Sequence, residues 1–401
     1  MLGAGATEVP GSVVQYNDIN QGYYQQPPYT SQLEMYSNDY ALGVCIPAGK
    51  VQYNYVHSVN GRGIGCIFGG DQNNESINNN YITAGELAVN GEYGPNGSIN
   101  GGTWVGGCEI DGGRGFETKE SLAIQLLNNT LIANVSQCGA GGIVFTSFPC
   151  VDTTCPGSAS HPFNFHDNTI QIVNTSGSTT LSTPQDAACY VFDTAQGNYS
   201  NYFSPFLRDR CTSDGDYVTT DGYSPGDYFN FVSPSYSFGS HPLSSGCGGG
   251  TRSSCGHMMH WQGQQGPPSE LGFVFQDVMT GGGAAVNFAG DDGTPMARSA
   301  TVEWTYTVTV HSSATSAAVS GATVSATDAG GNKASCTTNS SGVCSLALNQ
   351  ESVSSPSGSA NLSTKNLNPN SVTISATSCT TLSYSLAISG TTNETRTLAC
   401  Q

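Results

Sequence analysis

Short apolar runs recur along the first three quarters of the chain, and each run is bounded by Asn, Asp, Gly or Ser. The clearest example is residues 122–145, LAIQLLNNTLIANVSQCGAGGIVF, in which an Asn-Asn step separates two apolar runs and a glycine-rich turn precedes a third. Short runs rich in Ile, Val, Leu and Phe favour β-strands over helices. We therefore predict an all-β chain.

Near-copies of this stretch follow along the chain. They are FNFHDNTIQIVN (163–174) with AACYVF (187–192), LGFVFQDVM (271–279) with AAVNF (284–288), and a weaker copy, GSINGGTWVGG (97–107). Repeats at such spacing are typical of a solenoid, in which each copy forms one coil. The alternative is the chance echo that any β protein rich in Asn and Gly can show.

Two columns of residues align when the copies are superimposed. The first contains Asn100, Asn128, Asp167 and Asp277, and the second contains Phe145, Phe192 and Phe288. Asn and Asp tolerate the left-handed backbone of a tight bend. We predict that the first column lies at a bend between strands and that its side chains hydrogen-bond from one coil to the next.

The composition changes near residue 312. Most aromatic residues and all three Trp precede this point, whereas Tyr384 is the one aromatic residue after it. Residues 300–311 alternate apolar and polar positions, which is typical of a half-buried strand. The sequence predicts an N-terminal cap or extension (1–40), a solenoid (41–311) and a small β-sandwich (312–401).

The chain contains 14 cysteines, and none forms a CxxC pair with zinc-like spacing. Many cysteines without metal spacing indicate disulfides and an oxidising compartment. Cys336 and Cys344 flank an NSSG turn, and Cys379 and Cys400 lie in the last predicted strands. Spacing favours these two pairs over the alternatives and leaves the connectivity of residues 45–255 open.

Charged residues make up 10% of the chain, and the net charge is −18 with 11 basic residues. Nucleic acid is an unfavourable partner, because neutralising phosphates requires clusters of Lys and Arg. No run approaches the ~20 apolar residues of a membrane span. The first residues lack the basic and apolar regions of a signal peptide, so we expect a trimmed chain from an extracellular or cell-surface protein.

Two segments resemble pectin-lyase-like right-handed parallel β-helix proteins. ALGVCIPAGKVQYNYVHSVNGRGIGCIFGG (41–70) is similar to the family's opening coil, and LLNNTLIANVSQCGAGGIVF (126–145) is similar to its I-x-x-N-x-I repeat followed by G-I-x-F. The resemblance spans about residues 40–310. It implies a right-handed parallel β-helix and a protein that binds or cleaves polysaccharide.

The C-terminal part resembles carboxypeptidase-regulatory-like or bacterial Ig-like domains. VSGATVSATDAGGN and CTTNSSGVCSLAL follow that family's order of a strand, a D-x-x-G-N turn and a return strand. The resemblance implies an Ig-like β-sandwich and carries almost no functional information, since such modules serve as spacers, adhesive units and carbohydrate-binding units alike.

The resemblance to pectin-lyase-like proteins implies two catalytic patterns. The hydrolase pattern is not present in order, because the Cys-Gly-His at 255–257 precedes the Gly-Asp-Asp at 290–292, and no R-x-K occurs. The lyase pattern combines Ca²⁺-binding Asp residues with a basic residue, and RDRCTSDGDYVTTDGYSPGD (208–227) matches it in part. We therefore predict catalytic roles for Asp193, Arg208, Arg210, Asp214 and Asp216. Asp214, Asp216 and Asp221 are the predicted Ca²⁺ ligands, since a hard cation takes 6–8 oxygen ligands. The alternative is a solvated, turn-rich loop.

Aromatic residues crowd residues 199–238, which we interpret as a long loop. Sugar rings stack on aromatic faces, and tyrosine adds a hydroxyl group. Tyr199, Tyr202, Tyr217 and Tyr223 are the predicted substrate-binding residues; the alternative is that these rings only pack the loop onto the coil. In GHMMHW, His257 and His260 are two potential zinc ligands, but no third ligand is evident beside them.

Three functions fit these observations. The first is an extracellular β-helix protein that binds, and in its strongest form cleaves, a polysaccharide. The second is a structural or adhesive surface protein that assembles with copies of itself, and the third is a viral tail fibre. Ca²⁺ is the cofactor that the first function would use.

Overall fold

The structure is a computed structural model of the 401-residue chain. It describes residues 11–21, 40–43, 48–58, 62–66, 76–84, 98–99, 102–103, 114–118, 125–135, 140–145, 164–175, 177–185, 187–192, 205–220, 229–247, 254–261, 270–290, 297–356 and 361–401. These residues form strands and connections without a helix, which confirms the all-β prediction. Within these ranges there is accordingly no helix that could cross a membrane.

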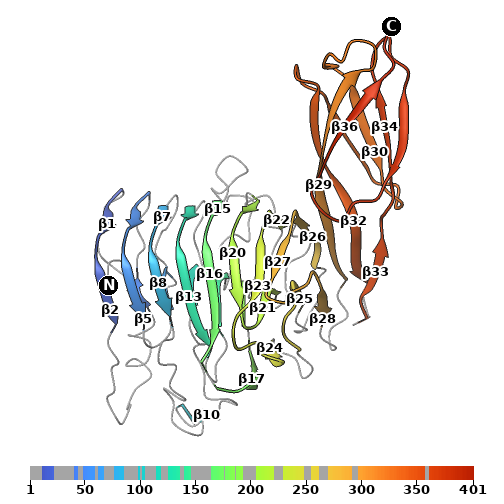
Figure 1. The fold of residues 1–401 in the computed structure, drawn as a ribbon. Helices are drawn as coiled ribbons and strands as arrows, with labels where there is room; N and C mark the ends of the chain where they lie inside the picture. The colour runs from blue at the N-terminus through green and yellow to red at the C-terminus, as the bar shows by residue number, and fades with distance from the viewer. Residues whose placement is uncertain are drawn as a thin grey trace, which may run out of the picture.

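Three parallel sheets form the larger part of the molecule (Figure 1). The first sheet contains β1 (Val13–Gln15), β4 (Lys50–Gln52), β7 (Ser76–Asn78), β12 (Gln125–Leu127), β15 (Asn164–His166), β19 (Phe206–Leu207), β22 (Asn230–Val232) and β26 (Glu270–Gln276). The second contains β2 (Asp18–Gln21), β5 (Tyr55–Ser58), β8 (Tyr81–Ala84), β13 (Thr130–Val135), β16 (Thr169–Asn174), β20 (Arg210–Ser213), β23 (Ser235–Phe238) and β27 (Met279–Gly281). The third contains β3 (Tyr40–Gly43), β6 (Arg62–Cys66), β11 (Arg114–Thr118), β14 (Ala140–Phe145), β18 (Ala187–Phe192), β21 (Asp216–Thr220), β25 (Met259–Trp261) and β28 (Phe288–Gly290).

The chain visits the three sheets in the same order eight times, and we call each visit a coil. This arrangement is compatible with a parallel β-helix or solenoid. Two short pairs accompany the coils: β9 (Ser98–Ile99) with β10 (Gly102–Thr103), and β17 (Thr180–Gln185) with β24 (Ser245–Cys247). Three of the four repeats found in the sequence, at 122–145, 163–192 and 271–288, are coils, whereas the weak copy at 97–107 falls on the antiparallel pair β9 and β10. The first coil begins at β1, inside the segment predicted to be a cap or extension.

The core runs along the inside of the stack. In β13 and β16, buried and half-buried residues alternate, as expected when one face of a strand packs inward. In the first sheet the inward column contains Val51, Ile77 and Leu126 in the early coils and Phe165, Phe206, Phe231 and Phe275 in the later ones. Each coil therefore covers the apolar face of its neighbour, which no coil could bury alone.

The predicted bend column is in register, because Leu127 pairs with His166 just before Asn128 and Asp167. Asn128, Asp167 and Asp277 all have the left-handed backbone, with φ of 56°, 58° and 55°. Two of them bond onward as predicted, because Asp167 accepts hydrogen bonds from Arg208 of the next coil and Asp277 accepts them from Thr305 of β29. The inward column of bonds, however, is formed by the residues that follow Asn128 and Asp167. In the second column, Phe145 pairs with Phe192 as predicted. Phe288 is two residues out of that column, because it pairs with Met259. Asn100 lies outside the described residues.

An asparagine ladder follows the bend through the first five coils. It contains Asn17, Asn54, Asn80, Asn129 and Asn168. The Oδ1 atom of each later member accepts hydrogen bonds from the backbone N and the Nδ2 of the member before it, as Asn129 does from Asn80 at 3.0 Å each. Each Nδ2 from Asn54 to Asn168 also donates to a carbonyl of the preceding coil. Asp209 is the sixth member and ends the ladder, because Pro234 takes the equivalent position in the next coil.

The C-terminal part consists of two antiparallel layers that share a long strand with the coils. β29 (Arg298–Ser312) pairs with β26 through its first half, with β36 (Thr392–Leu398) through its second half, and with β32 (Val343–Ser355) along most of its length. β33 (Ser363–Asn366) extends this sheet, and β31 (Lys333–Thr337), β30 (Thr323–Thr327), β34 (Asn370–Ser375) and β35 (Leu382–Leu386) form the other layer.

The predicted boundary at residues 311 and 312 falls inside β29. One hydrophobic core extends to Ala300, and a second begins at Tyr306, so the change of core lies about ten residues earlier than the change of composition. The C-terminal part contains the disulfides Cys336–Cys344 and Cys379–Cys400, which are the pairs expected from the spacing.

Candidate functional site

Asp214 lies in the interior, at the turn that follows β20. Its side chain is 2% exposed, and its carboxylate accepts hydrogen bonds from the backbone N–H groups of Asn174 (2.8 Å) and His241 (2.9 Å). These bonds fix the segment from Gly239 to Leu243 against the stack. Asp214 therefore closes a turn, whereas the sequence predicted a carboxylate that lines a groove and binds Ca²⁺.

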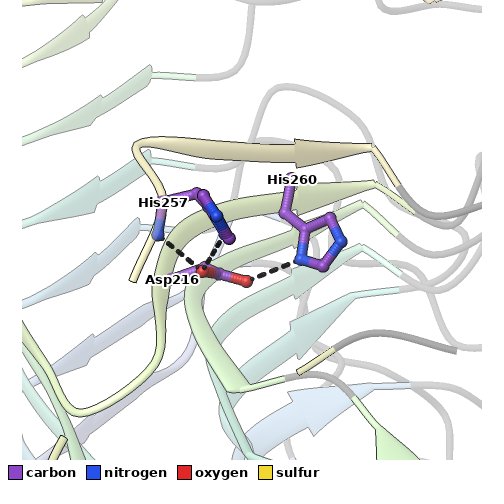
Figure 2. A group of neighbouring side chains, drawn as sticks. All are labelled: Asp216, His257 and His260. Carbon is purple, nitrogen blue, oxygen red and sulfur yellow. Dashed lines mark hydrogen bonds and ion pairs between the residues drawn. The ribbon is translucent and has the colours of Figure 1, made fainter. Parts of the chain in front are cut away.

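Asp216 begins β21 and meets two histidines from the following coil (Figure 2). Its Oδ1 atom accepts the backbone N–H of His257 at 2.7 Å and lies 3.2 Å from the Nδ1 of the same residue. Its Oδ2 atom lies 2.9 Å from the Nδ1 of His260. Asp216 is fully buried and His260 is 1% exposed. The sequence predicted these three residues separately, and the structure brings them into one cluster.

Two local features place Asp216 in this position. Gly215 comes so close to the backbone of Ala187 in the neighbouring coil that an added Cβ would lie 2.0 Å from the Ala187 carbonyl oxygen. The chain can therefore turn inward just before Asp216 only at a glycine. On the other side, the Cys247–Cys255 disulfide closes the loop that leads into His257.

The electrostatics of the cluster favour an ionised carboxylate. Burial would raise the pKa of Asp216, but the hydrogen bonds and charges of His257 and His260 outweigh burial and lower its pKa to about 2. A buried negative charge requires a positive partner, because its hydration has been lost. The cluster is thus an anionic oxygen with two imidazoles directed at it, which is the donor set of a metal site or of a buried ion pair.

The two predicted catalytic arginines lie on the outside of the stack, away from this cluster. Arg208 and Arg210 are exposed at the bend between the first and second sheets, whereas Asp216 begins a strand of the third. Arg208 binds Asp167 through two hydrogen bonds of 2.8 and 2.7 Å. The side-chain bond and charge of Arg208 exceed the effect of burial and lower the pKa of Asp167 to about 2. Among the predicted residues that the structure describes, Asp214 and Asp216 are therefore not brought together with Arg208 and Arg210.

The aromatic segment predicted as a binding loop is largely part of the coils. Tyr217, Tyr236 and Phe231 are fully buried, and β19 to β23 run through this segment. Tyr217 packs against Tyr190 and Phe231 in edge-to-face contacts with centroids 5.6 Å apart. A buried ring offers no face to a sugar, so the alternative of core packing holds for these side chains. The remaining predicted residues, Asp193, Tyr199, Tyr202, Asp221 and Tyr223, lie outside the described residues.

Exposed aromatic residues gather instead at the bend of the first three coils, and we call them the tyrosine row. Its members are Tyr16, Tyr53, Tyr55 and Tyr81, which are between 36% and 72% exposed. Tyr16 stacks on Tyr53 with ring centroids 5.3 Å apart, and Tyr55 stacks on Tyr81 at 4.8 Å. Among the described residues, the other large exposed apolar side chains are Val13 in the first coil and Met279 in the last.

Amide side chains flank the tyrosine row. Gln15 and Gln52 adjoin it in the first sheet, where the Gln52 Nε2 donates to the Gln15 Oε1 at 2.7 Å. Asn79 and Asn128 continue the bend column beyond Tyr53 and are exposed. The row therefore combines aromatic rings with hydrogen-bonding side chains, among them the exposed Asp18 that pairs in register with Tyr55.

Sequence reasoning missed both features for identifiable reasons. The strands next to the tyrosine row are three or four residues long, and Tyr16, Tyr53 and Asn79 differ in residue type at the same bend position. The histidine cluster had a usable signal, since Asp216 and His257 are 41 residues apart, the same separation as Asp167 and Arg208 in adjacent coils.

Comparisons with known proteins found no relative: no family model matches the chain, and neither a curated protein nor a solved structure matches it significantly.

Proposed function

We propose that the chain is an extracellular right-handed parallel β-helix protein with an Ig-like C-terminal domain, and that it binds a polysaccharide on its tyrosine row. Four disulfides within the described part of the chain, Cys189–Cys211, Cys247–Cys255, Cys336–Cys344 and Cys379–Cys400, support the oxidising compartment. The resemblance to pectin-lyase-like proteins supports the ligand class.

The observation that carries the proposal is the exposure of four tyrosines at one bend, whereas the other aromatic rings in the described part of the chain largely form the core. Exposed apolar side chains that gather at one place mark interaction surfaces. A tyrosine presents an apolar face that stacks on the ring of a sugar, and a hydroxyl that bonds to the sugar's hydroxyl groups. Because neighbouring coils are about 4.8 Å apart and the rings stack in pairs, the row offers ring edges and hydroxyl groups at regular steps along the stack.

The groups around the row can bond to the hydroxyl groups of a sugar. The amides of Gln15, Gln52 and Asn79 both donate and accept hydrogen bonds, and the ring of His57 and the exposed Asp18 also lie beside Tyr55. We propose binding without cleavage, because Asp214 and Asp216 are buried and already hold hydrogen bonds within the protein.

The test compares glycan binding by matched variants of the full chain. Tyr55→Ser and Tyr81→Ser remove one stacked pair, and each lost ring should weaken binding by about 1–3 kcal/mol if it stacks as aromatic residues do on flat ligand rings. Met279→Ser is the control, because Met279 occupies the same strand column at the far end of the stack and is also exposed. A polysaccharide panel read by affinity electrophoresis and calorimetry should show the loss for the tyrosine variants alone. Equal binding by all variants would place the ligand elsewhere.

A second candidate is self-assembly, which the position of β1 and β2 favours. These strands are the first members of their sheets, and an end strand presents backbone groups that can pair with another chain. Val13 and Tyr16 are exposed on the same coil. Analytical ultracentrifugation of the same variants separates the two functions: loss of assembly with unchanged glycan binding would assign the tyrosine row to contacts between copies.

A further inference from the structure

We propose that Asp216, His257 and His260 bind a divalent transition-metal ion, with Zn²⁺ as the best match, and that this ion fastens two consecutive coils together. The proposal is independent of the tyrosine row.

The distances fit a small ion with few ligands. One oxygen or nitrogen atom from each residue can be chosen so that all three atoms lie within 4.8 Å of one another. The separations between the carboxylate oxygens and the two Nδ1 atoms are 3.2 and 2.9 Å. Ligand atoms on a tetrahedral zinc ion with bonds of about 2.0–2.2 Å lie roughly 3.3–3.6 Å apart. The two separations between oxygen and nitrogen lie within a few tenths of an ångström of this range, and the distance between the two histidine ligand atoms is at most 4.8 Å.

The chemistry of the ligands favours a transition metal over the Ca²⁺ expected from the sequence. Imidazole nitrogens suit zinc, copper, iron and nickel, whereas Ca²⁺ takes six to eight oxygens. The cluster offers two nitrogens and one carboxylate. The neighbouring Asp214 supplies no further oxygen, because its carboxylate is occupied by the amides of Asn174 and His241.

The surrounding structure holds the three ligands in place. His260 lies in β25 and pairs with Thr219 of β21, the strand that Asp216 begins. The backbone N–H of His257 is bonded to Asp216, and its Nε2 lies 3.3 Å from the Ser254 Oγ. Partners on the second ring nitrogen orient metal-binding histidines and typically affect affinity 10- to 100-fold. Ser254 is therefore a positioning residue for this site.

The charge balance also supports a cation at this position. The Asp216 carboxylate is fully buried and faces the Nδ1 atoms of both His257 and His260. A divalent ion compensates it while both imidazoles remain neutral, as ligands must be. His257 is the more accessible histidine, with 12% of its side chain exposed against 1% for His260, so the ion would enter beside His257.

The first experiment uses the full chain purified without a histidine tag, stripped with a chelator and titrated with Zn²⁺. We expect one ion per chain by calorimetry and elemental analysis, and a higher unfolding temperature in the metal-bound protein. Co²⁺ in place of Zn²⁺ should give the visible absorption of a four-coordinate site. Stripped protein that binds no Zn²⁺ and melts at an unchanged temperature would overturn the proposal and leave Asp216 and the histidines as a buried ion pair.

The second experiment locates the site with graded variants. His257→Ala should weaken Zn²⁺ binding by more than the roughly 10–100-fold typical of an outer partner, and Ser254→Ala should weaken it by about 10-fold. His241→Ala is the control, because His241 is exposed and its ring contacts Ser240. If His257→Ala does not fold, Ser254→Ala still tests the site. Ser254 is exposed and its replacement leaves all three ligands in place, so this variant should fold. Equal loss of binding in the His241 variant, or no loss in either of the other two, would refute the assignment.

Discussion

In the first five coils a column of buried asparagine side chains passes from coil to coil, whereas from the fifth coil onward a column of stacked phenylalanine rings runs along the same stack. The ladder members from Asn54 to Asn168 are at most 2% exposed. The ring centroids of Phe165, Phe206, Phe231 and Phe275 follow one another at 5.5, 4.7 and 5.2 Å. The two halves share one backbone arrangement and differ in what supports it.

The difference shows that the two supports place unequal demands on the sequence. An amide ladder needs a donor and an acceptor at every step, so each coil must supply Asn at one position. A stack of rings needs only a large flat side chain, and the positions around it are free to change. The repeat was nevertheless recognised in both halves, at 122–145 beside the ladder and at 271–288 beside the rings.

The two halves meet at Asp209. Its Oδ1 atom accepts the last ladder bonds from Asn168, and its Oδ2 atom accepts a hydrogen bond from the hydroxyl of Tyr190, a ring that packs on Phe206 and Phe231. Burial raises the pKa of Asp209 to about 7 despite these hydrogen bonds. At this junction the stability of the ladder therefore depends on the protonation state of Asp209.

The largest effect is expected in the ring stack. Phe231→Ala should lower the free energy of unfolding by about 3–5 kcal/mol, because it empties a fully buried position between two stacked rings. Leu126→Ala in the same column of the ladder half is the comparison, with about 2–5 kcal/mol expected. Urea unfolding followed by near-ultraviolet circular dichroism measures both. If Phe231→Ala lowers the free energy of unfolding by less than Leu126→Ala does, the stacked phenylalanine rings contribute nothing beyond ordinary burial. The proposed difference between the two halves would then be wrong.

Removing one member of the asparagine ladder should lower the free energy of unfolding somewhat less than removing a stacked ring. Asn129→Ala removes the acceptor of two hydrogen bonds from Asn80 and leaves buried groups unpaired, which should cost about 2–4 kcal/mol. Asn128→Gly is the matched control, because Asn128 is exposed and has the left-handed φ that glycine adopts freely. Its unfolding free energy should be close to that of the parent protein. Equal losses for the two variants would mean that the bend, and not the ladder, is what matters.

At the junction we expect that replacing Asp209 increases the free energy of unfolding by an amount that depends on pH. The folded pKa of Asp209 is about 7 against about 3.9 in an unfolded chain, so its contribution is fully present below pH 4 and is lost as the pH rises through 7. Asp209→Asn continues the ladder with a group that does not titrate. It should raise stability by about 1–3 kcal/mol at pH 8.5, less than the full linkage value of about 4 kcal/mol, because the new amide must still satisfy Tyr190. Thermal unfolding between pH 5 and 8.5 measures the effect, and a variant with the parent's pH dependence would contradict the proton at this site.

The smallest effect on stability is expected for the exposed ion pair at the bend of the fifth and sixth coils. Arg208→Gln breaks the ion pair with Asp167 on the exposed side of the stack. Exposed pairs of this kind contribute little and are screened by salt. The unfolding temperature in 0.5 M salt, a concentration at which the Debye length is only about 4–5 Å, should not change measurably. A clear decrease there would show that the bend column supports the stack as the ladder does.

The sequence was sufficient for the parallel, repeating architecture but not for the direction of each polar side chain. Asn128 and Asn129 are both polar, and the left-handed residue between two strands interrupts the simple alternation of inward and outward positions. Register could therefore be read from the sequence, whereas the ladder column was placed one residue early. In the seventh coil, Ser233 and Pro234 replace the polar pair, and that coil could not be recognised at all.

The candidate sites were predicted less well than the fold, because contacts between coils join residues about 40 positions apart. Asp216 and His257 were both noticed, yet nothing in the local sequence of either one indicates the other. The aromatic residues from 206 to 238 were interpreted as a binding loop because their strands are short and lack the Asn repeat. Burial, which separates a core ring from a binding ring, is a property of the folded stack.

The shared strand β29 has a mechanical consequence. Asp277 at the last bend accepts hydrogen bonds from Thr305 of β29 and from Thr391 near the start of β36, so the junction is fastened beside the strand as well as through it. A pulling force applied to the C-terminal part would load all the β26–β29 hydrogen bonds in shear at the same time. A flexible linker would instead transmit the force through the covalent backbone alone. The coils and the C-terminal part should therefore move as one rigid body, and a force applied to the C-terminal part would be transmitted directly to the coils.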